Sequence, residues 1–268
     1  MASIPGYISG RRYFRTDGVG DRIEEVAADG RRTRLDLNTP ENLFRRARAA
    51  GLRTELYGWY FPSCRLLPGL LDRCVDYSLY NASSVRPGFS PLDAVRTNLI
   101  LWPYQFPAAL LRNPPFADHQ RLVAARLEAH AVEPFEPDAG TLRFVHFSIP
   151  HVPFVFDRNG YNPPFDPVTD RLDAYQRQLE YVDGVFGRIL ASVSGRGDAP
   201  VTTIVVLSDH EYRAVTPREG WSHVPLLVRT PATHSRRDVV EAVRAEEILR
   251  NLVDECAGES AAVPPEAR

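Results

Sequence analysis

The stretch from Val201 to His210 constrains the fold more than any other part of the sequence. It reads VTTIVVLSDH, with β-branched or apolar residues at nearly every position before a polar Ser-Asp-His ending. Such a run is typical of a strand buried on both faces of a parallel sheet. Ligands of open α/β sheets bind beyond the carboxyl ends of the strands. We therefore expect Asp209 and His210 at a functional edge, with a turn-capping Asp209 and an ordinary surface His210 as an equal alternative.

Composition narrows the class of protein without identifying it. The 268 residues suffice for one large α/β domain or two small ones, and 44% apolar with 25% charged residues is typical of a soluble globular protein. The formal net charge of -2 gives no reason to expect nucleic acid or a membrane surface as a partner. We see neither an apolar run of membrane-spanning length nor a signal peptide, so we expect the chain as written to be soluble.

The pattern of helices and strands favours an α/β domain. Thr39 as N-cap, Pro40 in the first turn and Gly51 after the last turn predict a helix, which is followed by a strand over 52–58. The best helix covers 170–194, where apolar residues recur at steps of three and four: Leu172, Tyr175, Leu179, Val182, Phe186 and Ile189. Further expected elements are an opening helix that ends at Gly10, a loop over 13–21, helices over 91–101, 118–130 and 236–255, and strands over 141–147 and 222–229.

An aromatic, irregular segment covers residues 59–81. We interpret it as a packing layer at the edge of the sheet, with the wall of a substrate pocket as the alternative. Cys64 and Cys74 lie in this segment, and their spacing is not that of a zinc site. Two unpaired buried thiols are slightly favoured, whereas a chain outside the cytosol would join them in a disulfide.

Four polar side chains fall at the ends of three predicted strands: His151, Asp209, His210 and His223. Each alone is a weak signal, but together they predict a convergent cluster of metal and anion ligands. Calcium and magnesium prefer oxygen ligands, whereas a carboxylate beside an imidazole suits Zn²⁺ or Mn²⁺.

Several motifs resemble the sulfatase/alkaline-phosphatase superfamily in their order along the chain. They are YQRQLEYVDGVFGRIL followed by TTIVVLSDHE, HVPF at His151, SHVPLLVR at His223, and SIPGYISGR near the start. The resemblance implies a three-layer α/β/α alkaline-phosphatase-like domain over 1–258, with a mostly parallel sheet that lacks its first strand. Separately, we expect residues 259–268 to form a disordered tail.

The resemblance also assigns roles to residues. Asp209 and His210 would bind a divalent metal, with Zn or Mn favoured and Ca possible. His151 and His223 would hold the oxygens of the ester or donate a proton to the leaving group. Glu211 departs from the family, which usually has Gly there, and Tyr161 and Arg213 are weaker candidates for the border of the pocket.

The implied reaction is attack of a nucleophile on a sulfate or phosphate ester of a small molecule, glycan or lipid. Resolution by water makes a hydrolase, and resolution by an alcohol makes a transferase. No nucleic-acid partner is implied, and membrane attachment would need segments absent from this chain. A full-length parent would be periplasmic, extracellular or membrane-tethered.

The register of the opening motif places the family nucleophile one residue before Met1. Ser3 is a poor substitute, and Ser9 a poorer one. We therefore expect this chain to be truncated, with little turnover and weak divalent binding. One hypothesis is a partial record of a working enzyme, and another is an inactive remnant that binds an anion or glycan. A third is an unrelated α/β domain with a coincidental Ser-Asp-His ending.

Overall fold

The structure is a computed structural model of the whole chain. It describes residues 3–11, 13, 15–19, 22–77, 115–136, 140–151, 153–162, 171–195, 201–210, 224–231 and 245–262. The expected helix over 91–101 lies outside these residues. Within the described part of the chain, none of the helices has the length and apolarity needed to cross a membrane.

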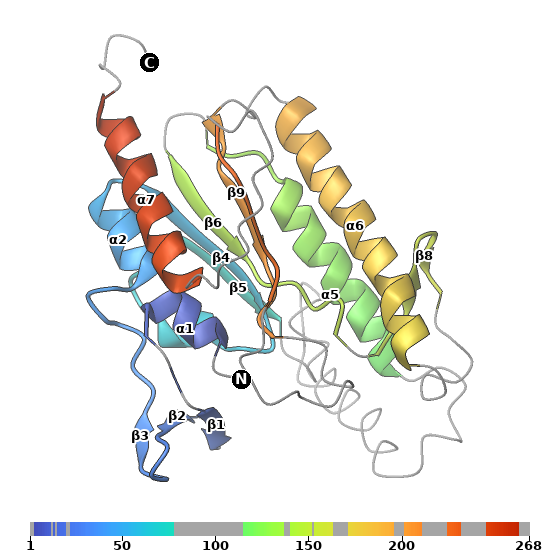
Figure 1. Cartoon of the computed structure of the whole chain (residues 1–268), viewed down its shortest axis with the longest axis horizontal. Helices are drawn as coiled ribbons and strands as arrows, with labels where there is room; N and C mark the ends of the chain where they lie inside the picture. Colours follow the sequence, from blue (N-terminus) through green and yellow to red (C-terminus); the bar gives the residue numbers. More distant parts are fainter. Residues whose placement is uncertain are drawn as a thin grey trace, which may run out of the picture.

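A parallel sheet of three strands forms the middle layer (Figure 1). Its order is β5-β4-β6, and Tyr57 of the central strand lies opposite Val75 and Val145. The strands are β4 (Arg53–Trp59), β5 (Arg73–Tyr77) and β6 (Thr141–Val145). The strands expected over 52–58 and 141–147 are thus confirmed, whereas β5 falls in the segment that we expected to be irregular.

Helices cover both faces of this sheet (Figure 1). On one face lie α1 (Ser3–Ser9), α2 (Leu43–Ala49) and α7 (Ala245–Ala262), and on the other lie α5 (Pro115–Val132) and α6 (Arg171–Gly195). The short helix α3 (Ser63–Leu66) connects β4 to β5. This arrangement has the three α/β/α layers that the sequence predicts.

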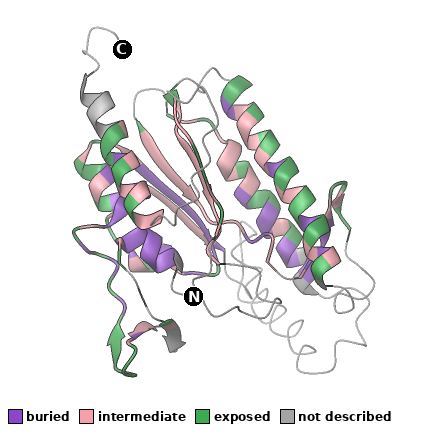
Figure 2. Cartoon of the chain, in the orientation of Figure 1, coloured by how far each residue is buried: buried purple, intermediate pink, exposed green. Residues whose placement is uncertain are grey.

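The alternation of side chains along β4 explains why both faces need a cover. Leu56 packs in one core cluster with Phe44 of α2 and Leu249 of α7. Its neighbour Tyr57 packs in a second cluster with Val123 and Leu127 of α5. A central parallel strand buried on both faces results, as Figure 2 shows for β4.

The strand that starts near Val201 does not have the expected surroundings. β9 (Ile204–Leu207) pairs antiparallel with β10 (Leu226–Arg229), and all four β9 residues are only partly buried. The prediction of a parallel strand buried on both faces was therefore wrong. β-Branched residues favour any pleated, half-buried strand, so they do not specify its partner or its second face.

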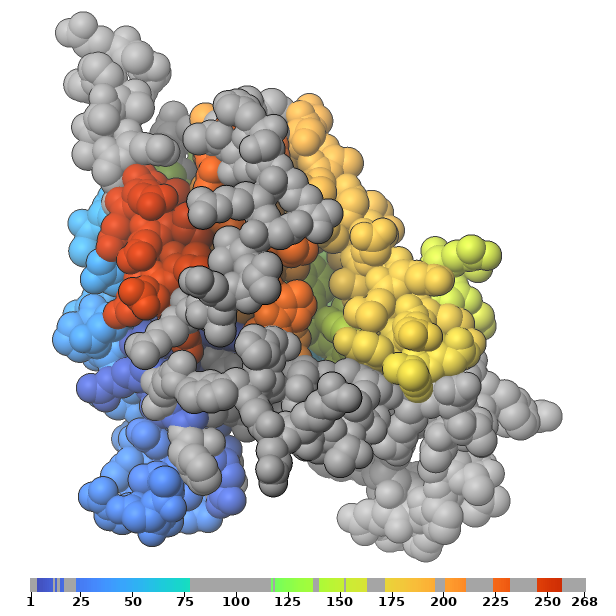
Figure 3. All heavy atoms as spheres, viewed as in Figure 1, coloured from blue at the N-terminus to red at the C-terminus, as the bar shows by residue number. Residues whose placement is uncertain are grey.

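Two further small sheets were not expected. An antiparallel sheet follows α1, where a loop was expected, and it forms a blue lobe at the lower end of Figure 3. Its strands are β1 (Arg15–Val19), β2 (Arg22–Val26) and β3 (Arg32–Arg34), and a hairpin of β7 (Phe156–Asp157) and β8 (Gly160–Tyr161) follows β6. Because β3 is exposed throughout, it lacks the apolar alternation that marks a strand in sequence.

The N-cap of α2 is also different from the one that we expected. The Asn42 side-chain oxygen accepts hydrogen bonds from the backbone N–H groups of Phe44 and Arg45, whereas the Thr39 hydroxyl donates to the Ser9 carbonyl at 2.7 Å. The helix does end before Gly51, which has a φ of 78°. α7 begins at Ala245 and continues to Ala262, and residues 236–244 lie outside the described part.

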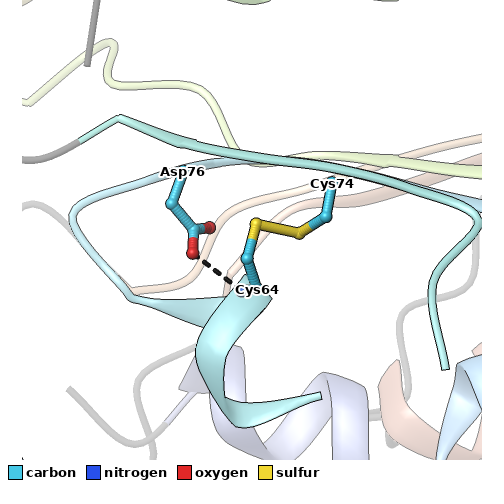
Figure 4. Close-up of a disulfide and its surroundings, with 3 residues drawn as sticks. All are labelled: Cys64, Cys74 and Asp76. Carbon is cyan, nitrogen blue, oxygen red and sulfur yellow. Dashed lines mark hydrogen bonds between the residues drawn. A yellow bond between two sulfur atoms is a disulfide. The ribbon is translucent and has the colours of Figure 1, made fainter. Parts of the chain in front are cut away.

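Cys64 and Cys74 form a disulfide that joins α3 to β5 (Figure 4). The slightly favoured prediction of two unpaired thiols was wrong. Asp76 lies beside the disulfide, and its carboxylate accepts a hydrogen bond from the Cys64 N–H at 2.7 Å. Both sulfurs are bonded to each other, so this group of three residues does not offer thiolates to a metal.

Candidate functional site

The candidate site lies where β6 and β9 end. The His146 N–H donates to the Tyr57 carbonyl at 2.9 Å, so β6 stays attached to β4 for one residue beyond its last strand position. The Tyr7 hydroxyl donates to the Ser208 carbonyl at 2.9 Å, and this bond fixes the end of β9 to α1. Both attachments come from elements far away in the sequence, and they hold the residues that follow at a defined edge.

Asp209 and His210 form a close pair directly after β9. His210 Nε2 lies 3.8 Å from Asp209 Oδ1, and both side chains are partly buried. A single ion can span such a distance, because bonds from zinc to carboxylate oxygen and imidazole nitrogen are each about 2 Å long. The oxygen and nitrogen donors therefore fit a divalent metal. Across the described residues, however, this pair has no third ligand atom close enough to complete a compact group of three.

His151 and His146 approach the site from the chain that follows β6. The His151 ring meets the indole ring of Trp59 edge-on, with centroids 5.0 Å apart, and the His146 ring lies 6.0 Å from the same indole. Trp59 is only 3% exposed, and its indole nitrogen is buried without a hydrogen-bond partner. Trp59, at the start of the aromatic segment, therefore packs at the carboxyl end of the central strand and also contacts both histidines.

Electrostatic interactions connect the four polar residues. Burial lowers the pKa of His146 to about 4, the Asp209 charge opposes this shift, and His151 and His210 add to it. The His146 ring is thus neutral at pH 7. Burial also raises the pKa of Tyr7 to about 12, with Glu246 and Asp209 as smaller causes. The Tyr7 hydroxyl keeps its proton, as its bond to Ser208 requires.

Of the other predicted ligand and pocket residues, the structure describes only Tyr161. His223, Glu211 and Arg213 lie outside the described residues. Tyr161 packs against Phe156 with ring centroids 6.1 Å apart, and the Arg121 guanidinium lies over its ring.

Ser9 does not resemble an exposed nucleophile at the beginning of a helix. Ser9 is fully buried at the end of α1, where its hydroxyl oxygen accepts hydrogen bonds from the Tyr13 hydroxyl and the Arg11 N–H. Ser3 begins α1, and its side chain is outside the described part.

Our sequence analysis missed His146. The signal was present, because His146 directly follows the apolar part of a predicted strand, as Asp209 does. We applied the strand-end rule to the segment 148–154 and not to the last residues of the strand itself.

Comparisons with known proteins agree with this fold. Residues 135–254, which include His146, His151, Asp209 and His210, match the family model described as Sulfatase. This match supports a relation of the chain to the sulfatase superfamily. A comparison with curated proteins finds no match.

Solved structures with a similar fold add support for the alkaline-phosphatase-like architecture. The crystal structure of Ps i-CgsB in complex with k-i-k-neocarrahexaose has a TM-score of 0.56 at 14% identity, covering 99% of this chain and 62% of that chain. A structure from Bacteroides thetaiotaomicron, described under metabolism of multiple glycosaminoglycans (BT33494S-sulf), has a TM-score of 0.54 at 15% identity, with the same coverage of 99% and 62%. This chain therefore spans less than two thirds of the length of these structures.

Proposed function

We propose that the chain is a sulfatase-like domain that binds a divalent metal and a sulfate ester at the ends of β6 and β9. The observation that carries this proposal is the cluster of Asp209, His210, His146 and His151, which lies wholly within the segment matched by the sulfatase family model. The similar structures that hold neocarrahexaose or concern glycosaminoglycans support a sulfated glycan as the ester.

Asp209 and His210 would hold the metal, because they offer a carboxylate oxygen and an imidazole nitrogen 3.8 Å apart. Zn²⁺ or Mn²⁺ suits this donor pair better than Ca²⁺ does. A bound divalent ion supplies positive charge that stabilises the nonbridging oxygens of an ester during attack.

The residues around the metal pair have complementary roles in this proposal. His151 would hold an ester oxygen or transfer a proton to the leaving group. The unpaired indole N–H of Trp59 is a buried donor that an ester oxygen would satisfy. His146 stays neutral at pH 7, so it adds no positive charge beside the metal pair.

Metal titration tests the assignment of Asp209. We expect Zn²⁺ or Mn²⁺ to bind the purified chain, followed by calorimetry, and Asp209→Asn to weaken this affinity by about tenfold or more, because even loss of an outer-shell partner costs about 10- to 100-fold. Asp183→Asn is the matched control, since Asp183 is exposed on α6. Equal affinities of the wild type and Asp209→Asn would exclude our metal site.

Incubation with a sulfated carrageenan oligosaccharide then separates the candidate activities. Metal-dependent binding with release of inorganic sulfate indicates a hydrolase. Transfer to an added alcohol indicates a transferase, and turnover of an aryl phosphate but no sulfate ester indicates phosphoryl chemistry. Metal-dependent binding without any turnover indicates a non-catalytic remnant, which is the alternative function.

A further inference from the structure

Two glutamines from different helices hold the backbone carbonyl of His151. Gln178 of α6 donates its side-chain N–H to this carbonyl at 3.0 Å, and Gln120 of α5 donates to the same oxygen at 3.3 Å. The two side chains are 0% and 1% exposed. A carbonyl oxygen has two lone pairs, so these two amides can occupy its full accepting capacity.

The same glutamines also fix the chain on both sides of His151. Gln120 donates to the Ser148 carbonyl, and the Gln178 side-chain oxygen accepts from the N–H groups of Val155 and Phe156 at 2.9 and 3.3 Å. The loop that carries His151 is therefore attached to α5 and α6 at its beginning, middle and end.

The opposite side of the loop is fixed by the sheet. The His151 ring meets Trp59 at the end of β4, with ring centroids 5.0 Å apart. The carbonyl is thus held by the helix layer while the imidazole rests on the strand layer. A rotation of the backbone at His151 would have to break one of these attachments.

Packing alone does not account for two amides at these positions. An apolar side chain of similar size would fill the same space, but it would leave backbone groups of the loop without these hydrogen bonds, at a cost of about 1–3 kcal/mol for each buried group. Two buried amides that converge on one carbonyl therefore hold the backbone at His151 in one position.

We propose that Gln120 and Gln178 are positioning residues that set the His151 imidazole against Trp59, beside the Asp209–His210 pair. The inference rests on the proposed function for its chemical purpose. It adds that helices α5 and α6 determine the place of the ester-holding imidazole. A displacement of about 1 Å can reduce the rate of an enzyme by about 100-fold, so such control has a large effect.

Gln178→Glu tests the inference. The change removes the amide donor to His151 but keeps an oxygen that can accept from Val155 and Phe156. Gln176→Glu is the matched control, because Gln176 lies on the exposed side of the same helix. Gln120→Met, which removes the other donor, is the second variant in case Gln178→Glu does not fold.

The first readout is the imidazole proton resonance of His151, assigned by its loss in His151→Gln. The ring of Trp59 should shift this resonance in the wild type. We expect it to move toward the position of a free histidine in Gln178→Glu and in Gln120→Met, and to stay in place in Gln176→Glu. An unchanged resonance in both folded test variants would overturn the inference.

The second readout is binding of the sulfated oligosaccharide compared with binding of metal. We expect Gln178→Glu to weaken oligosaccharide binding by roughly tenfold or more, while Zn²⁺ or Mn²⁺ affinity stays unchanged. Equal losses of oligosaccharide affinity and metal affinity would indicate a merely structural role for Gln178 and would also overturn the inference. If the wild type binds no sulfate ester while the resonance still moves, the proposed function fails and only the positioning of His151 stands.

Discussion

Replacement of Asp76 by asparagine should change how the stability of the protein depends on pH. Asp76 lies on β5 beside the disulfide, where one carboxylate oxygen accepts from the Cys64 N–H and the other is buried without a partner. Burial raises the pKa of Asp76 from 3.8 to about 6, and hydrogen bonds from the backbone of Cys64 and Ser63 oppose the shift. The folded state therefore prefers the protonated acid.

The magnitude and sign follow from this pKa. Below pH 3.8 both states bind the proton, and the stability associated with the protonated acid is fully present. As the pH rises, the unfolded chain releases its proton first, so stability is lost until the pH passes about 6. The shift of about 2 pKa units corresponds to a loss of about 3 kcal/mol in the free energy of unfolding over the whole pH range. Roughly 2 kcal/mol of this is lost between about pH 4 and pH 7.5.

Urea unfolding of the wild type and Asp76→Asn at about pH 4 and about pH 7.5 measures this effect. Asparagine stays neutral, so the free energy of unfolding of Asp76→Asn relative to the wild type should rise by roughly 2 kcal/mol over this interval. Asp72→Asn is the contrasting control, because a hydrogen bond from the Thr54 N–H lowers the pKa of Asp72. The reasoning is refuted if the Asp76→Asn difference is constant with pH or falls as the pH rises.

Two further predictions concern the disulfide and the buried face of α6. Replacement of both Cys64 and Cys74 by serine opens a link between residues 10 apart and should lower the free energy of unfolding by about 2–3 kcal/mol; an unchanged urea midpoint would contradict this. Val185→Ala should cost about 1–3 kcal/mol because Val185 is buried, whereas Leu179→Ala should cost less than about 0.5 kcal/mol because Leu179 is 39% exposed. Thermal unfolding of the two variants compares them, and equal losses would show that the burial of α6 has been misassigned.

The α6 helix shows how local patterns predict an element but not its buried face. Its extent was predicted within about one residue, since apolar periodicity is local. Leu172 of the predicted stripe is 52% exposed, whereas Ala174 and Gln178 are buried. Alanine is apolar but too small to mark a buried face, and glutamine is polar. Both are buried because α5 and the His151 loop lie there.

The candidate site also combines residues that local sequence patterns predict with residues that such patterns do not reveal. The rule that ligands gather at strand ends led to His151, Asp209 and His210, and it would also have found His146 had we applied it to the whole strand. It gave no indication of Gln120 and Gln178, because their bonds to the His151 carbonyl connect elements separated by about 30 residues.

By itself, the sequence predicted strands β4 and β6, the long helices and the resemblance to sulfatases, and it drew attention to His151, Asp209 and His210. These features depend on the repeat of apolar residues along one element and on motifs of adjacent residues. Tertiary structure decided the antiparallel partner of β9, the Cys64–Cys74 bond, Asn42 as the N-cap and the amide contacts to His151. Each of these required two segments to meet in space, and the free energy of such a contact depends on everything packed around it.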